Sequence, residues 1–262
     1  SAMFYQYDGK KFNGDISKWD VSRVTDMNMM FCACKYLHID ISEWDVAGVI
    51  DMDKMFSGAK TFNGDISKWN VSNVNNMKNI FCSASAFNGN ISKWDLSSVQ
   101  NMYGMFFDAT SFNGDISKWD VHSVTHMSST FCGATSFNGD ISKWDVSNVK
   151  YMNRMFLGAR LFNSDVSTWD VSNVITMDYM FRDAAGFRQE LCQPSWLNSK
   201  ASKIDMFTGS PGSISQTAHL ATFFSQGALK RAVVAYLKSS PQSDCLHGPI
   251  GEWDVSRITD MH

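Results

Sequence analysis

The sequence FNGDISKWDVS occupies residues 12–22, and nearly the same letters return every 25 residues along the chain. Tryptophan keeps this interval without a slip, at Trp19, Trp44, Trp69, Trp94, Trp119, Trp144 and Trp169. Self-similarity at a fixed period of roughly 20 to 50 residues is typical of proteins built from stacked structural repeats. The repeat therefore predicts a solenoid, in which each copy packs mainly against its two neighbours.

Within one copy, the apolar spacing predicts a strand, a corner, a short helix and a turn. Residues 66–71 carry isoleucine, tryptophan and valine at the LxxLxL spacing of a leucine-rich repeat strand. Apolar residues then follow at helical spacing over 77–87. A helix of that length is marginal on its own and could relax into a 3₁₀ turn. Asn88-Gly89 predicts a turn, because both residue types tolerate positive φ.

These elements predict an α/β fold, a right-handed solenoid of 25-residue repeats similar to leucine-rich repeats. It would have a column of parallel strands plus short helices or 3₁₀ turns, and an all-β solenoid is the alternative. We expect a partial repeat or N-terminal cap at 1–11, seven repeats at 12–186, a degenerate eighth repeat at 187–212, a helical capping segment at 213–241, and a linker with the start of a further repeat at 242–262. We therefore expect the parent protein to continue into more repeats.

Charge and hydropathy argue against two classes of partner. The net charge is -3 over 262 residues, so we expect no strong electrostatic attraction to nucleic acid. No run of 18 apolar residues occurs, so we expect no transmembrane helix and no membrane insertion. No phosphate-binding loop, dinucleotide fingerprint or HExxH motif is present, and we predict no cofactor.

Three columns of acidic residues recur with the repeat, beginning at Asp15, Asp20 and Asp26. Stacked carboxylates about 5 Å apart repel by roughly 1–3 kcal/mol, so something must offset the repulsion. A calcium ladder would use the carboxylates as oxygen ligands. Alternatively, each carboxylate could accept a hydrogen bond from a nearby backbone N–H, as in Asx turns and helix N-caps. Asparagine replaces aspartate in every column and keeps the acceptor without the charge, which favours hydrogen bonding and no metal site.

Lysines stand two residues before the second acidic column, and period two places both on one face of a strand. We predict that this face is the binding surface, by analogy with leucine-rich solenoids, although a solvated sheet without a ligand explains it equally well. The candidate residues are Lys18, Asp20, Lys68, Lys93, Asp95, Lys118, Asp120, Lys143 and Asp145. A specific binder should also cluster aromatic residues or arginine at variable outward positions. The columns through Arg23 and Tyr36 contain no dense cluster of this kind.

Neither serine nor cysteine predicts chemistry. Serine recurs from Ser17 to Ser167, but no histidine accompanies it at constant spacing, so it is not a catalytic nucleophile and we predict no enzyme. Cys32, Cys82 and Cys132 share one column two repeats apart, roughly 10 Å, which is too far for a disulfide. Cys34 occupies an alanine column and should be a small buried side chain, while pairing of Cys192 with Cys245 stays open.

The pattern WDVSNVxxM followed by MFxxAxxFNGDIS resembles the repeat of the DUF285 or BspA-like surface-protein family, found in mycoplasma and Listeria lipoproteins. The resemblance covers nearly the whole chain except residues 218–248. It implies a location at the cell surface or secretion, and binding rather than a defined reaction. We therefore expect a non-enzymatic scaffold for a protein or glycan ligand. A purely architectural spacer is the alternative, and a sugar-active enzyme is a third, less favoured one.

Overall fold

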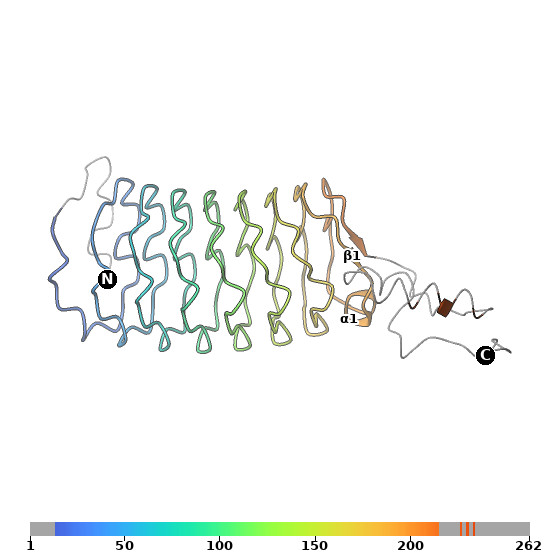
Figure 1. Ribbon diagram of the computed structural model, residues 1–262, viewed down its shortest axis with the longest axis horizontal. Helices are drawn as coiled ribbons and strands as arrows, with labels where there is room; N and C mark the ends of the chain where they lie inside the picture. Colours follow the sequence, from blue (N-terminus) through green and yellow to red (C-terminus); the bar gives the residue numbers. More distant parts are fainter. Residues whose placement is uncertain (1–13, 215–225, 227–228, 231–232, 234–262) are drawn as a thin grey trace.

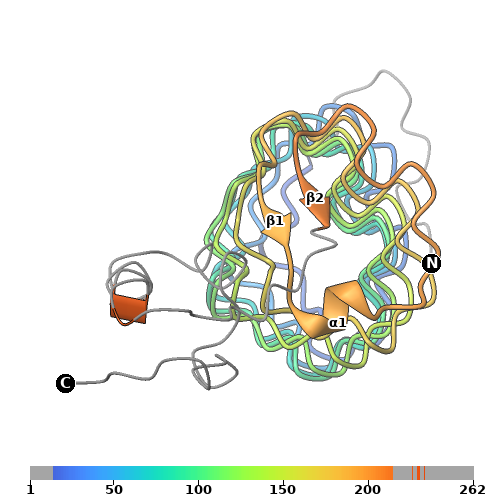
Figure 2. The ribbon, with the colours of Figure 1, turned by 90° about the vertical axis from the view of Figure 1, so that its right-hand side faces the viewer.

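The computed structural model describes residues 14–214 together with Gln226, Leu229, Lys230 and Val233. Over 14–214 the chain winds in successive coils that lie side by side (Figure 1) and superpose around one interior when seen from the end (Figure 2). Parallel β-bridges join each coil to the next, at Asp26, Asp51, Asn76, Asn101, His126, Tyr151, Thr176 and Ser202. We propose that this stack is a solenoid; its handedness and its kinship with leucine-rich repeats stay predictions.

The named elements of the described residues lie in or beside the degenerate eighth copy. They are β1 (Glu190–Leu191), α1 (Pro194–Leu197) and β2 (Ser213–Ile214), and β1 pairs with β2 in parallel. Trp196 of α1 is buried, and its indole Nε1 donates a hydrogen bond to the carbonyl of Val166 at 3.1 Å. The tryptophan column therefore continues into a coil whose sequence has lost the regular spacing.

The strand expected over 66–71 is absent, since the described coils contain no strand there. The backbone N–H of Trp69 instead bonds the carbonyl of Ile66 in its own coil, at 3.2 Å. The indole of Trp94 makes the contact to that coil, donating from Nε1 to the same Ile66 carbonyl at 3.1 Å. Six tryptophans from Trp44 to Trp169 repeat this bond, so side chains join the coils along this side.

The short helix expected over 77–87 is also replaced, by consecutive turns. The amides of Met77, Asn79, Phe81 and Ser83 donate to the following coil at 2.6–3.1 Å. Between them, the amides of Ile80 and Cys82 bond the carbonyl three residues back, and that of Lys78 donates to the side-chain oxygen of Asn76. Asn79 and Ser83 have left-handed φ values of 53° and 56°, which a right-handed helix cannot contain. We call residues 77–84, with the equivalent residues of the other coils, the turn ribbon.

The tryptophan column forms part of the core. Trp44 to Trp169 are at most 4% exposed, whereas Trp19 in the first described coil is 38% exposed. Phenylalanines fill the rest of the interior: Phe81 lies 3.9 Å from Phe87 between ring centroids and 5.6 Å from Phe106 of the next coil. Stacking of this kind adds to the burial of the rings and keeps equivalent residues in register.

Asn88-Gly89 forms no left-handed turn, because neither residue has positive φ. The amide of Asn88 donates to the side-chain oxygen of Asn63 at 2.9 Å, and Asn113 does the same to Asn88. This asparagine ladder runs on to Arg188. Glycine follows because a Cβ at Gly89 would lie 3.0 Å from the Phe87 ring, closer than side chains normally pack.

Several expected segments fall wholly or mostly outside the described residues. They are the cap at 1–11, most of the helical segment at 213–241, and the linker and further repeat at 242–262. Of the helical segment, Gln226, Leu229, Lys230 and Val233 are helical, whereas Ser213–Ile214 form β2. Among the described residues there is no helix that is both long enough and apolar enough to span a membrane.

Candidate functional site

Side chains of the acidic columns act as hydrogen-bond acceptors for the backbone two residues on. In the first column, Asp115 Oδ1 accepts the backbone N–H of Ser117 at 3.0 Å and its hydroxyl at 2.7 Å. Asn90 makes the same two bonds to Ser92, at 3.1 and 2.8 Å. The second column repeats the arrangement, for example in Asp145 with the residue at 147, and so does the third, at residues 51 and 101. The hydrogen-bonding prediction is therefore confirmed.

These bonds stabilise the charged form of the carboxylates. The backbone N–H of Ser117, then its hydroxyl, and to a lesser extent Lys118, lower the pKa of Asp115 below 3.8. The Ser147 hydroxyl and backbone lower the pKa of Asp145 in the same way. In Asp115 and Asp145, hydrogen bonds from the same coil therefore favour the anionic form.

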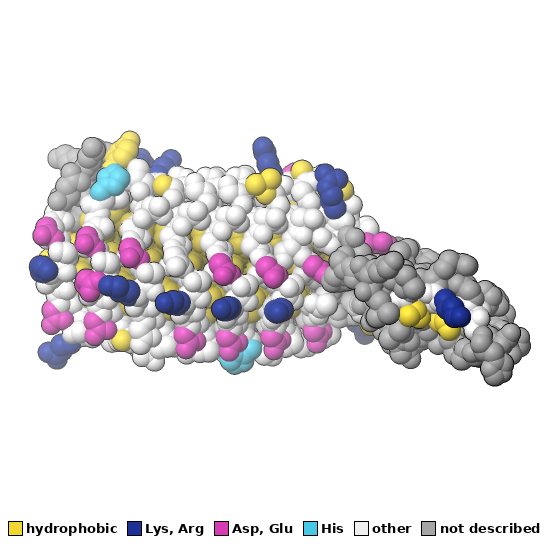
Figure 3. Space-filling model, in the orientation of Figure 1, with side chains coloured by type: hydrophobic (Ala, Val, Ile, Leu, Met, Phe, Trp, Pro, Cys, Tyr) yellow, Lys and Arg dark blue, Asp and Glu magenta, His cyan; other side chains and the backbone are white. Residues whose placement is uncertain are grey.

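The candidate residues predicted from the sequence all lie at the surface. They comprise Lys18, Asp20, Lys68, Lys93, Asp95, Lys118, Asp120, Lys143 and Asp145, which we call the Lys/Asp face. Figure 3 shows a row of basic side chains running along the coils between two rows of acidic ones. The row is interrupted in the coil that has Glu43 in the lysine column and in the coil that has Thr168 there.

Ion pairing within this face is sparse. Lys68 Nζ lies 2.7 Å from Glu43 Oε1 of the preceding coil, an exposed pair that contributes little to stability. Within residues 14–214, Lys93, Lys118 and Lys143 have no carboxylate oxygen within 4.0 Å. These three lysines therefore make no direct ion pair with the aspartate column among the described residues, and their ammonium groups face solvent.

A hollow of about 400 Å³ lies on the same face between two coils. Its lining includes Lys68, Asn70, Asn90 and Lys93. Amide and ammonium groups there offer hydrogen-bond donors and acceptors in a shallow, open setting. Such an arrangement suits a polar ligand that lies along the surface.

The cysteines lie away from this face. Cys32, Cys82 and Cys132 are free thiols, as predicted. Burial raises the pKa of Cys34 and of Cys132 to about 11. Cys192 is disulfide-bonded, and Cys245 falls outside the described residues. Over the part of the chain that the structure describes, no group of three or more histidine, cysteine or acidic side chains could hold a metal ion.

A family model described as "Mycoplasma protein of unknown function, DUF285" matches residues 1–119 and again residues 104–219. The chain belongs to the DUF285 family. No match was found among curated proteins or among solved structures.

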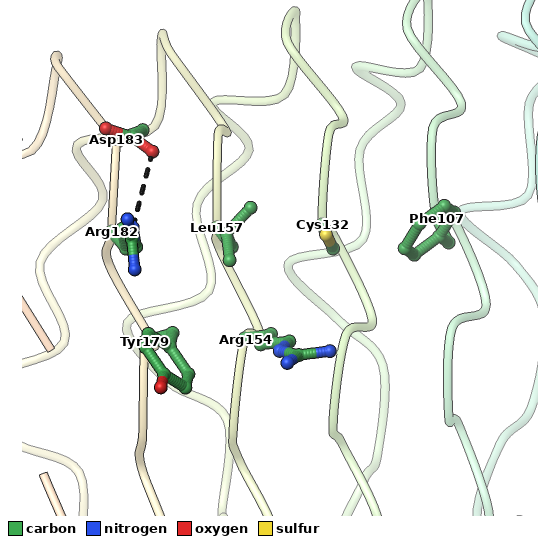
Figure 4. Close-up of a pocket in the computed structure, with 7 residues that line it drawn as sticks. All are labelled: Phe107, Cys132, Arg154, Leu157, Tyr179, Arg182 and Asp183. Atoms are coloured by element: carbon green, nitrogen blue, oxygen red, sulfur yellow. Dashed lines mark ion pairs between the residues drawn. The ribbon is translucent and has the colours of Figure 1, made fainter. Parts of the chain in front are cut away.

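This DUF285 chain has a second surface feature that the sequence analysis missed. Tyr179 on the turn ribbon lies between two arginines, with the guanidinium carbons of Arg154 and Arg182 each 5.5 Å from its ring centroid. Figure 4 shows these side chains on neighbouring coils beside Leu157 and Cys132. Both columns, through Arg154 and Arg182, lie off the apolar face of the helix expected over the turn ribbon, and no role was predicted for them.

Proposed function

We propose that this DUF285 chain is a non-enzymatic repeat scaffold that binds a protein or glycan ligand through the Lys/Asp face. The observation that carries the proposal is the row of exposed lysines at Lys93, Lys118 and Lys143, which have no carboxylate oxygen within 4.0 Å among residues 14–214 and are set in a frame of hydrogen-bonded aspartates. The frame is rigid because both ends of each Asx turn belong to the same coil. A repetitive ligand would meet the same groups in each coil.

The family resemblance supports a place at the cell surface or outside the cell, within a longer array of repeats. The serine column supports a non-catalytic role, because the hydroxyls of Ser42 and Ser117 donate to the aspartate two residues back in the same turn and no histidine recurs beside them. A catalytic serine needs a neighbouring general base that takes the hydroxyl proton while the serine oxygen attacks the substrate. The repeated serine therefore completes the turn.

A glycan array and a protein array probed with the 262-residue chain test the proposal. We expect a ligand whose binding is lost in the double variant Lys93→Glu/Lys118→Glu and kept in Arg160→Glu. Arg160 is exposed in the same repeat as Lys143 and lies outside the Lys/Asp face, so it controls for net charge. Binding that the double variant leaves unchanged would contradict the assignment of this face.

A purely architectural spacer is the second candidate. It is favoured by the continuity of the indole and asparagine ladders, which join each described coil from Trp44 to Arg188 to its neighbour. A spacer needs that continuity but no ligand. Arrays on which neither the wild type nor the charge variants bind would favour this candidate over the scaffold.

A further inference from the structure

The turn ribbon carries a hollow of about 410 Å³ that none of the residues of the Lys/Asp face lines. Its floor follows one column across four coils, through Phe107, Cys132, Leu157 and Arg182 (Figure 4). The first three are apolar, so the floor is a short apolar strip. Side chains of the neighbouring column, Arg154 and Tyr179, border it.

The two arginines of the hollow differ in their partners. Arg182 lies 3.7 Å from a carboxylate oxygen of Asp183 and 3.5 Å from one of Asp205. Arg154 is exposed and, within residues 14–214, has no carboxylate oxygen within 4.0 Å. Its guanidinium contacts the face of Tyr179 instead. The positive charge of Arg154, beside the apolar strip, is therefore not neutralised by any carboxylate of residues 14–214.

The backbone beneath the cluster has the left-handed φ that this column has in every coil from Met29 to Tyr179. Arg154 and Tyr179 both have φ of 59°, at a position that glycine fills in another coil as Gly104. Left-handed φ is unfavourable for large side chains, so placing arginine and tyrosine there carries a conformational cost. Asp183 lines the opposite border of the hollow. The equivalent residues of the two preceding coils are Gly133 and Gly158, which add no side chain there. The hollow thus combines bulky polar side chains on one border with open backbone on the other.

We propose that this hollow is a docking site for a partner protein, which inserts a segment carrying an acidic residue next to an apolar one. The apolar side chain would cover Phe107 and Leu157, and the carboxylate would accept from the guanidinium of Arg154. Arginine forms forked hydrogen bonds to carboxylates, and tyrosine and arginine dominate the energetics of protein interfaces. Tyr179 holds both guanidinium groups by cation–π contact, so the site is pre-organised.

A displayed library of short linear peptides, selected on the immobilised 262-residue chain, tests the site. We expect enriched peptides in which aspartate or glutamate adjoins leucine, isoleucine or an aromatic residue. For a synthetic copy of the strongest peptide, Arg154→Glu should raise the Kd about tenfold or more, because it replaces attraction by repulsion. Arg154→Lys should retain part of the affinity, and Tyr179→Ala should weaken it.

Two matched variants keep the result specific. Arg160→Glu makes the same charge change at an exposed arginine of the same coil, and Lys118→Glu makes it on the Lys/Asp face. Both should leave the Kd unchanged. The proposal is overturned if no acidic–apolar peptide is enriched, or if Arg154→Glu binds as the wild type does while retaining its circular dichroism spectrum. Equal losses in Arg160→Glu would likewise overturn it, whereas a loss confined to Lys118→Glu would assign binding to the Lys/Asp face.

Discussion

Replacing Trp94 separates the two ways in which the tryptophan column stabilises the coils. Trp94 is 3% exposed and donates to the Ile66 carbonyl, which also accepts the backbone N–H of Trp69. Trp94→Phe removes only the indole bond, a net loss of about 0.5–1.5 kcal/mol since Ile66 keeps one donor. The smaller ring adds about 1 kcal/mol for the space it leaves. Trp94→Ala loses the whole ring, about 3–5 kcal/mol, in addition to the bond.

Urea-induced unfolding, followed by circular dichroism, measures these differences from the midpoint and the slope. Trp19→Ala is the matched control, because Trp19 has the same flanking sequence but is already 38% exposed. Its truncation should cost less, roughly 2–3 kcal/mol. The reasoning fails if Trp94→Phe unfolds at the wild-type midpoint with an unchanged slope, or if Trp19→Ala is as destabilising as Trp94→Ala.

Three further predictions follow from the hydrogen bonds and the thiols. Asp120→Asn should melt at nearly the wild-type temperature, and Asp120→Ala should lose about 0.5–2 kcal/mol of stability, both in calcium and in chelator. A wild-type melting temperature that rises with calcium, and no longer does so in Asp120→Asn, would indicate a metal site. Alkylation under denaturing, non-reducing conditions should label Cys32, Cys82 and Cys132, and a disulfide between any two of them would contradict the stacking. In the native protein, Cys132 should react more slowly than Cys82, since burial raises the pKa of Cys132 to about 11. Because Asp15, Asp40 and Asp115 of the first column have pKa values lowered below 3.8, their stabilisation is complete above that pH and is lost on further acidification. A melting temperature that rises from pH 4 to pH 2 would contradict this sign.

The sequence predicts the interior well because burial repeats with the period. Trp94, Val99 and Phe106 are buried where their columns predicted, and asparagine substitution identified the hydrogen-bonding role of the aspartates. The same spacing misled the assignment of the backbone over 77–87. Residues on one face of a helix and on one face of a ribbon of turns can share a spacing, and only the left-handed φ of Asn79 and Ser83 separates the two structures. Asparagine hints at such a φ, whereas serine, arginine and tyrosine do not.

The missed surface cluster has the same origin. Arg154 and Tyr179 stand in a column off the apolar face of the predicted helix, so their proximity across coils was not considered. The backbone pairing of the turn ribbon is what brings them together: the amide of Arg154 donates to the carbonyl of Asp178, the residue before Tyr179, at 2.8 Å. The conformational preferences of single residues do not predict this pairing between coils, because it depends on which side of each coil makes the backbone hydrogen bonds to the next coil. The lysine row, by contrast, was visible as a column of one residue type.

The indole and asparagine ladders have a mechanical consequence. Their bonds join each coil to the next, so tension applied between the two ends of the stack would load them one after another rather than all together. A terminal coil has neighbours on one side only and would peel away first, releasing 25 residues, or roughly 80–90 Å of extended chain. Pulling on a single molecule would then give a series of small, evenly spaced extensions in place of one abrupt rupture. A protein of this construction would lengthen by whole coils under load and shorten again as each coil restacks on its neighbour.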